Sequence, residues 1–142
     1  MVVTTPERAR ELSRRPEVAV RLLGFGSARA EPGYMPEAPI PASRRALDAA
    51  GLGIADMDAI KSHNPFVVND IAFCRAFGLA PERMNNFGCS LVWGHPQGPT
   101  GLRGVIELIE ELAGRGGGRG LFLGCAAGDS AMAAVVEVGD AR

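Results

Sequence analysis

The sequence predicts an α/β domain with a mixed, mainly parallel sheet of about four to five strands, helices on both faces and an antiparallel C-terminal hairpin. Three observations support this fold class. Apolar, β-branched runs alternate along the chain with helical segments, beginning with Val18–Ala28. Apolar side chains recur between residues 102 and 112 at about the 3.6-residue spacing of an amphipathic helix. The last two apolar runs, Gly120–Cys125 and Ser130–Val138, flank a short turn, which is typical of a hairpin.

The N-terminal half of the chain has clear boundaries between its elements. Thr5-Pro6-Glu7 is a helix start, with an N-cap, a proline at the first helical position and an acid in the first turn. This helix should end near Ser13, ahead of Pro16. The four prolines between Glu31 and Pro41 predict a loop. Further along we expect a helix at Ser43–Ala50 closed by Gly51, a strand at Asp58–His63, and a helix at Val67–Phe77 closed by Gly78.

The segment Asn85–Gly101 has neither a helical nor a strand period and holds four glycines and two prolines. A structureless segment of this length in a compact domain is usually functional. Thr100 is expected to cap the helix that follows. That helix should bury one apolar stripe against the sheet, made of Leu102, Val105, Ile106, Ile109 and Leu112.

Composition and charge exclude several classes of function. Hydrophobic residues make up 46% and charged residues 22% of the 142 residues, which is the composition of a globular domain. Fifteen basic and sixteen acidic side chains leave a net charge of -1, which is no basis for binding nucleic acid or an anionic membrane. No apolar run approaches the roughly 20 residues that span a bilayer, and the first residues are too polar for a secretory signal. We therefore expect a cytoplasmic protein without nucleic-acid or membrane partners.

Cysteine usage agrees with that compartment. The three cysteines, Cys74, Cys89 and Cys125, are odd in number and show no CxxC spacing. A disulfide framework and a structural zinc site are both disfavoured by this pattern. We expect reduced thiols and no metal.

A histidine in the glycine-rich segment is the first candidate for chemistry. His95 lies between Gly94 and Pro96, directly before the predicted helix start. A helix N-terminus offers unpaired N–H groups and a partial positive charge, so an imidazole held there could act as a base or as an oxyanion donor. The alternative is a loop histidine satisfied by backbone carbonyls.

Two further candidates lie at the ends of predicted strands. The thiol of Cys125 lies at a strand end beside small residues, where backbone N–H groups could bind an oxyanion and a substrate could approach closely. The alternative is a buried structural cysteine. His63 is also at the end of a predicted strand, where α/β sheets place ligands, although it could simply be a polar residue leaving the sheet.

Taken in order, these motifs resemble the C-terminal domain of thiolases over nearly the whole chain, so residues 1–142 are treated as one such domain. His63-Asn64-Pro65-Phe66 stands where thiolases carry Asn-Glu-Ala-Phe or His-Asp-Cys-Phe. The run Asn85–Gly101 is similar to the family's Asn-X-X-Gly and Gly-His-Pro-X-Gly-X-(Ser/Thr)-Gly loop. Cys125 stands at the first position of its Cys-X-Gly motif, with Ala127 in place of the glycine. With a histidine at position 63, this motif is more similar to that of the sterol-carrier-type thiolases or of another divergent branch than to that of the simple acetoacetyl type.

The resemblance implies an acyltransferase of lipid metabolism that forms or cleaves the carbon–carbon bond of β-ketoacyl-CoA. A cysteine of the N-terminal thiolase domain would carry the acyl group. His95 would activate that nucleophile and help to bind the thioester oxyanion, with His63 as a further oxyanion donor. Cys125 would exchange a proton with the substrate α-carbon. Phe66, Ala127 and Gly128 are expected to bind substrate, and no cofactor is implied besides the CoA thioester itself.

The resemblance also implies a partner, because no motif in these 142 residues matches the nucleophile of the N-terminal half. We expect the chain to need that half, or a homologous subunit, and to form an oligomer. Two alternatives remain open. One is a thiolase-like retro-aldol lyase subunit that works with a small OB-fold partner. The other is a non-catalytic remnant that binds CoA or assists assembly. The acyl chain and the direction of reaction are not indicated.

Overall fold

A computed structural model describes residues 1–140 and shows a four-stranded mixed sheet, which confirms the predicted α/β class. The strand order is β1-β4-β3-β2, with β1 at Val18–Arg29, β2 at Ala59–Ser62, β3 at Gly118–Ala126 and β4 at Ser130–Asp140. The last two strands form the predicted antiparallel hairpin. Three strands share one direction, but β4 lies between β1 and β3. Two of the three ladders are therefore antiparallel, and only β2 and β3 pair in parallel, so the expectation of a mainly parallel sheet holds for strand direction and is wrong for the pairing.

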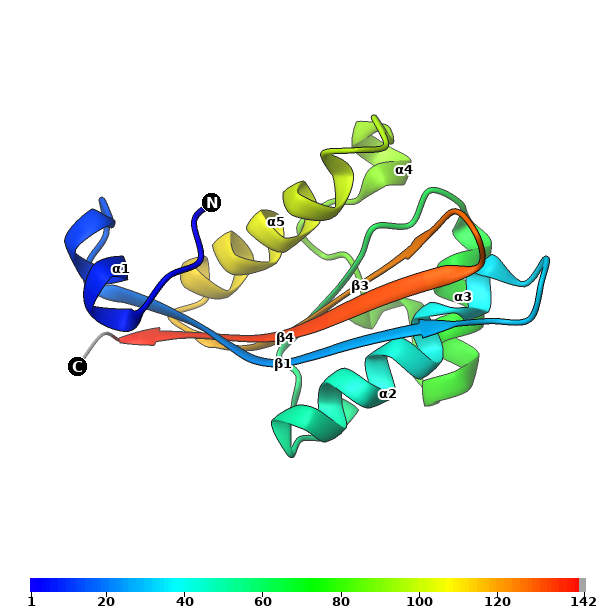
Figure 1. The fold of residues 1–142 in the computed structure, drawn as a ribbon, viewed down its shortest axis with the longest axis horizontal. Coiled ribbons are helices and arrows are strands. Elements are labelled where there is room, and N and C mark those ends of the chain that lie inside the picture. The colour runs from blue at the N-terminus through cyan, green and yellow to red at the C-terminus, as the bar shows by residue number, and fades with distance from the viewer. Residues whose placement is uncertain (141–142) are drawn as a thin grey trace.

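Helices cover both faces of the sheet, as predicted (Figure 1). Two helices, α2 (Pro39–Ala50) and α3 (Val67–Phe77), lie on one face. The longest helix, α5 (Thr100–Gly114), crosses the other face, and the one-turn helix α4 (Ser90–Trp93) lies just before it in the chain. The short helix α1 (Pro6–Leu12) lies at the end of the sheet away from α3.

The two strand glycines near the N-terminus let α2 approach the sheet closely. A Cβ atom at Gly24 would lie 2.2 Å from the Ala46 carbonyl oxygen, and one at Gly26 would lie 2.2 Å from the Ala42 carbonyl oxygen. Ala42 and Ala46 are fully buried on the facing side of α2. Small residues on both elements thus bring the helix backbone into contact with β1.

The loop in the proline-rich segment is shorter than the sequence predicts. Helix α2 already begins at Pro39 and includes Pro41, so the expected loop end at Pro41 and helix start at Ser43 are wrong. A proline in the first helical turn costs no hydrogen bond, because the N–H groups there have no intrahelical partner. A count of prolines therefore overestimates the length of a loop when the last prolines belong to the first turn of the next helix.

Helix α5 buries a different row of side chains from the one expected. Leu108 and Leu112 are fully buried against the sheet, and Gly104 lies in the same i, i+4 row, against the Phe122 ring. Of the predicted stripe, Leu112 is buried, whereas Leu102 and Ile106 are exposed. The helix has apolar side chains over a wide arc, and the sheet covers only one edge of it.

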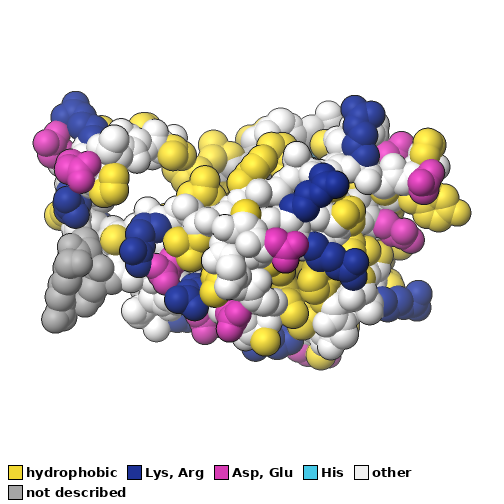
Figure 2. All heavy atoms as spheres, turned by 60° about the horizontal axis from the view of Figure 1, so that its bottom comes forward, with side chains coloured by type: hydrophobic (Ala, Val, Ile, Leu, Met, Phe, Trp, Pro, Cys, Tyr) yellow, Lys and Arg dark blue, Asp and Glu magenta, His cyan; other side chains and the backbone are white. Residues whose placement is uncertain are grey.

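The surface carries no large region of one charge on the side shown in Figure 2, where basic and acidic side chains are interspersed on the α2 side of the molecule. This distribution agrees with the net charge of -1. Within residues 1–140, no helix is long and apolar enough to cross a membrane.

Candidate functional site

The candidate site lies where the two parallel strands end. The backbone N–H of His63, directly after β2, donates to the Leu123 carbonyl of β3 at 3.0 Å. The parallel register, which pairs Ser62 with Leu123, places His63 beside the Gly124-Cys125 end of β3. The carboxyl ends of parallel strands are where open α/β sheets bind ligands.

The two histidines of the chain meet at this point although they are far apart in the sequence. The ring centroids of His63 and His95 are 5.0 Å apart, with the ring planes at 72°, an edge-to-face arrangement. The Nδ1 atom of His95 lies 3.0 Å from the Thr100 hydroxyl oxygen. A Cβ atom at Gly124 would lie 3.3 Å from His63 Nδ1, so glycine at this position leaves room for the His63 ring.

Thr100 has a different role from the expected one. Pro99 is the N-cap of α5 and Thr100 is its first helical residue, without a side-chain cap hydrogen bond. The predicted capping role is therefore wrong. The buried Thr100 hydroxyl instead contacts the His95 ring, which fixes one imidazole nitrogen at the start of α5.

Burial keeps His63 uncharged. The side chain is only 9% exposed. Loss of hydration on burial, together with the nearby His95, lowers the pKa of His63 to about 4. A neutral imidazole carries one N–H donor and one acceptor, so at neutral pH His63 can donate to a carbonyl or oxyanion without bringing a charge.

Cys125 is a buried thiol, and within residues 1–140 its side-chain hydrogen-bond partner is Asn69. It is 7% exposed, and the side-chain nitrogen of Asn69, in the first turn of α3, lies 3.2 Å from its sulfur. Burial raises the pKa of the Cys125 thiol, and the hydrogen bonds from Asn69 and from the backbone act in the opposite direction. The thiol is therefore protonated at neutral pH.

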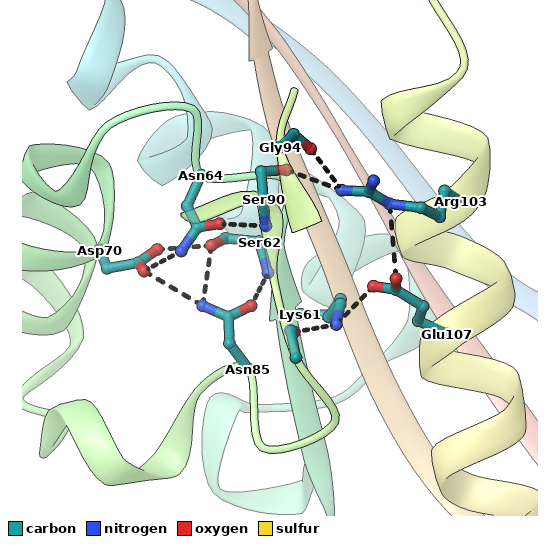
Figure 3. A network of polar contacts seen from close by, with 10 residues as sticks. Lys61, Ser62, Asn64, Asp70, Asn85, Ser90, Gly94, Arg103 and Glu107 are labelled. Atoms are coloured by element: carbon teal, nitrogen blue, oxygen red, sulfur yellow. Dashed lines mark hydrogen bonds and ion pairs between the residues drawn. The ribbon is translucent and has the colours of Figure 1, made fainter. Parts of the chain in front are cut away.

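Buried and half-buried polar side chains form a network between β2, α3 and the loop before α4 (Figure 3). The carboxylate of Asp70 on α3 accepts hydrogen bonds from Ser62 Oγ at 2.5 Å, Asn64 Nδ2 at 2.6 Å and Asn85 Nδ2 at 3.1 Å. The Asn64 side-chain oxygen accepts from the Ser90 backbone N–H at 3.1 Å. These bonds tie the end of β2, the start of α3 and the loop before α4 together.

Charged side chains extend this network to the His95 loop (Figure 3). Arg103 on α5 donates to the Gly94 carbonyl at 3.0 Å and lies 3.4 Å from Glu107. Glu107 also pairs with Lys61 at 2.6 Å, and the Lys61 ammonium donates to the Gly88 carbonyl as well. Because Gly94 directly precedes His95, Arg103 holds the backbone that presents the imidazole.

The segment Asn85–Gly101 is better ordered than the sequence suggests. It contains the helix α4, so the expectation of a structureless segment is wrong. Gly88 has φ of +92°, and a Cβ atom there would lie 2.3 Å from Trp93 Nε1. The indole of Trp93 therefore packs on the Gly88 backbone, which requires a glycine at that position.

The predicted substrate-binding residues lie at exposed positions near the ends of the same elements. Phe66 is the N-cap of α3, and Ala127 and Gly128 lie in the turn between β3 and β4. Their part in binding stays a prediction. Within residues 1–140, no group of three or more His, Cys, Asp or Glu side chains could hold a metal ion.

The residues that support the site were not among the predicted site residues: Asn64, Asn69, Asp70, Asn85, Ser90, Arg103, Glu107 and Lys61. Asn64 and Asn85 fall within the thiolase-like motifs but had no predicted role. A partial signal was present, since Asn69 and Asp70 are polar residues in an otherwise apolar first turn of α3. Lys61 gives a weaker signal, as a charged residue inside a short buried strand.

A second feature is an apolar surface that no helix of residues 1–140 covers. Helix α5 covers β3 and β2, while Val20, Leu22 and Phe25 of β1 and Met132 of β4 are exposed. An open groove of about 1610 Å³ is lined by β1, the edge of α5 and the N-terminal segment with α1. Exposed apolar side chains that lie next to one another are typical of interaction surfaces.

Comparison with known proteins identifies the family. The family model described as "Thiolase, C-terminal domain" matches residues 16–138. The acetyl-CoA acetyltransferase of Syntrophomonas wolfei is 36% identical over 139 residues, which are 96% of this chain and 35% of that protein. The beta-ketothiolase BktB of Cupriavidus necator is 33% identical over 95% of this chain and 34% of its own length.

Solved structures agree with the sequence matches. The crystal structure of human mitochondrial 3-ketoacyl-CoA thiolase in complex with CoA superposes with a TM-score of 0.79 at 30% identity, covering 83% of this chain and 30% of that one. The chain thus spans about a third of the length of the relatives it matches. The resemblance drawn from the sequence motifs is confirmed, and the chain belongs to the thiolase family as a thiolase C-terminal domain.

Proposed function

We propose that this chain is the C-terminal catalytic half of a thiolase-type acyl-CoA acyltransferase and works together with an N-terminal thiolase half. The observation that carries the proposal is the convergence of the His63–His95 ring pair with the Gly124-Cys125 strand end at the carboxyl ends of β2 and β3. Thiolysis or condensation of β-ketoacyl-CoA needs a proton-transfer group at the α-carbon and donors at the thioester oxygen. The thiol and the two imidazoles supply groups of both kinds.

In the thiolytic direction, Cys125 acts as the acid. The bond between the α- and β-carbons breaks, the acyl group moves to the nucleophilic cysteine of the N-terminal half, and the electron pair of the broken bond forms an enolate. The Cys125 S–H proton is transferred to the enolate carbon. A thiol whose pKa is raised by burial holds that proton at neutral pH. In the condensation direction the thiolate removes the same proton.

The two histidines act on oxygen and sulfur. His95, held by Thr100 at the start of α5, accepts the proton of the nucleophilic thiol. His63 remains neutral and donates a hydrogen bond to the thioester oxygen as negative charge develops there. The Arg103–Gly94 contact keeps the His95 backbone in place without touching the substrate.

The proposed occupant of the open apolar groove is the N-terminal thiolase half. The matched relatives are about three times as long as this chain, so a large part of each lies outside the matched region. Val20, Leu22 and Phe25 are exposed on β1 beside the part of the sheet that α5 covers. A helix packed beside α5 would bury these side chains together with Ile106 and complete the covering layer.

For location, we propose the cytoplasm. The free thiols motivate this, and one relative, from Rattus norvegicus, is named a cytosolic acetyl-CoA acetyltransferase.

The test is a fusion in which this chain replaces the matched C-terminal part of the Syntrophomonas wolfei relative. We expect the fusion to form acetyl-CoA from acetoacetyl-CoA and CoA. His95→Ala and Cys125→Ala should each lower kcat by at least about 100-fold. Cys74→Ala, which removes another buried thiol, should keep most of the activity.

Two results would contradict the proposal. A folded fusion that carries the nucleophilic cysteine and traps no acyl group would favour the retro-aldol lyase. A fusion that binds CoA tightly, with the same turnover in wild type, His95→Ala and Cys125→Ala, would favour a non-catalytic binding role.

A further inference from the structure

The side chain of Asn69 has an unusual set of contacts. It is 3% exposed, and its nitrogen lies 3.2 Å from the Cys125 sulfur. Its oxygen is buried and has no hydrogen-bond partner among residues 1–140. A buried amide placed for stability would pair its oxygen as well, because an unpaired buried acceptor costs free energy. The one polar contact that this amide makes is the thiol.

We propose that Asn69 is a positioning residue for Cys125, whose side-chain N–H holds the sulfur and stabilises the thiolate formed when the proton is transferred. The role of Cys125 in proton transfer rests on the proposed function. When the S–H bond breaks, its electron pair stays on sulfur and the proton forms the new C–H bond at the substrate α-carbon. A hydrogen bond strengthens when its acceptor becomes charged, so the amide contact is worth more to the thiolate than to the thiol.

Among residues 1–140, the side-chain hydrogen bond to the Cys125 sulfur comes from Asn69. From β4, the cross-strand neighbour of Cys125 is the apolar Ala131. After β2, His63 is uncharged above about pH 4. Next to Asn69, the Asp70 carboxylate is occupied by Ser62, Asn64 and Asn85, and would disfavour a thiolate.

Within residues 1–140, the charged side chains of the other elements near the end of β3 are exposed or bonded elsewhere. In the β3–β4 turn, the Asp129 carboxylate accepts from the Gly33 N–H. The side chains of Glu37, which precedes α2, and of Arg44 and Arg45 on α2 are exposed. Arg45 is bonded to the Ser27 carbonyl and Arg44 lies over the Phe77 ring.

Asn69→Leu is a suitable variant, because leucine has the same number and branching of side-chain heavy atoms as asparagine and removes the unpaired oxygen together with the donor. The measurement is a pH titration of the full chain labelled with ¹³C at the cysteine β-carbons, followed by NMR. We expect the Cys125 pKa to rise by about one to two in Asn69→Leu, from the strength of a hydrogen bond to a charged group. Cys74 and Cys89 serve as internal controls and should titrate as in the wild type.

A second readout uses the wild-type chain and does not depend on a variant that folds. The Asn69 side-chain amide resonances should move with the same midpoint as the Cys125 β-carbon. An amide that does not follow the Cys125 titration, an unchanged Cys125 pKa in a folded Asn69→Leu chain, or an equal rise at Cys74 would each overturn the proposal. Neither readout uses turnover. A failure of the Asn69 proposal is therefore distinguishable from an inactive fusion enzyme, which would overturn the proposed function alone.

Discussion

Replacing Lys61 by methionine removes a buried charge from beneath the His95 loop. Lys61 is 1% exposed, its ammonium lies 2.6 Å from the Glu107 carboxylate, and it also donates to the Gly88 carbonyl. Loss of one partner of a buried ion pair costs about 3–5 kcal/mol, because the other charge is left without compensation. Glu107 keeps Arg103 at 3.4 Å, so we expect the lower end, about 3 kcal/mol.

The assay is urea unfolding followed by circular dichroism, for the wild type and three variants. Arg8→Met is the matched control, since the Arg8–Glu11 pair is similarly short, at 2.5 Å, but exposed, and should cost less than about 1 kcal/mol. The double variant Lys61→Met/Glu107→Leu should recover part of the loss, because it no longer buries a carboxylate that has lost its nearest cation. A loss for Lys61→Met no larger than that for Arg8→Met would refute the reasoning.

Two further predictions concern the site and the sheet. The pKa of His63 is about 4 in the folded chain against an ordinary value of 6.5, so the unfolded chain binds the extra proton and the stability that the neutral ring contributes above pH 6.5 is lost as the pH falls toward 4. We measure the free energy of unfolding in urea at about pH 7 and about pH 4.5. The decrease should be about 2 kcal/mol larger for the wild type than for His63→Asn. Equal decreases in the two proteins would show that the His63 ring is not buried in its neutral form. Gly26→Ala should lower the melting temperature strongly and cost about 2 kcal/mol or more, because the new methyl group would lie 2.2 Å from the Ala42 carbonyl oxygen. Gly53→Ala is the matched control, whose new methyl group would lie no closer than 3.6 Å to its neighbours, and a similar loss in both variants would rule out the close helix approach as the cause.

Local rules of chain geometry were enough for much of the fold. Thr5-Pro6-Glu7 does open α1, Gly51 and Gly78 do close α2 and α3 in the left-handed conformation, and the apolar runs on either side of residues 127–129 do pair as a hairpin. Each of these signals acts within a few residues, through a cap, a fixed proline φ or a glycine with positive φ. The order of the motifs also indicated the thiolase family, which the comparisons confirmed.

Other features could not be predicted because they depend on contacts between distant segments. Threonine is a residue type that often caps helices, yet the Thr100 hydroxyl contacts His95 instead. The apolar arc of α5 is wider than the sheet beneath it, and the row through Leu108 is buried because Phe122 fills the space beside Gly104.

Residue patterns along the chain were enough to indicate the four strands, the helices other than α4, the family, and His63, His95 and Cys125 as candidate site residues. The ring contact between His63 and His95, the contact of Asn69 with Cys125 and the burial of Lys61 became visible in the folded chain alone. Hydrogen-bond partners, pKa values and burial depend on which strand ends and helix starts meet, and the register of β2 on β3 brings them together.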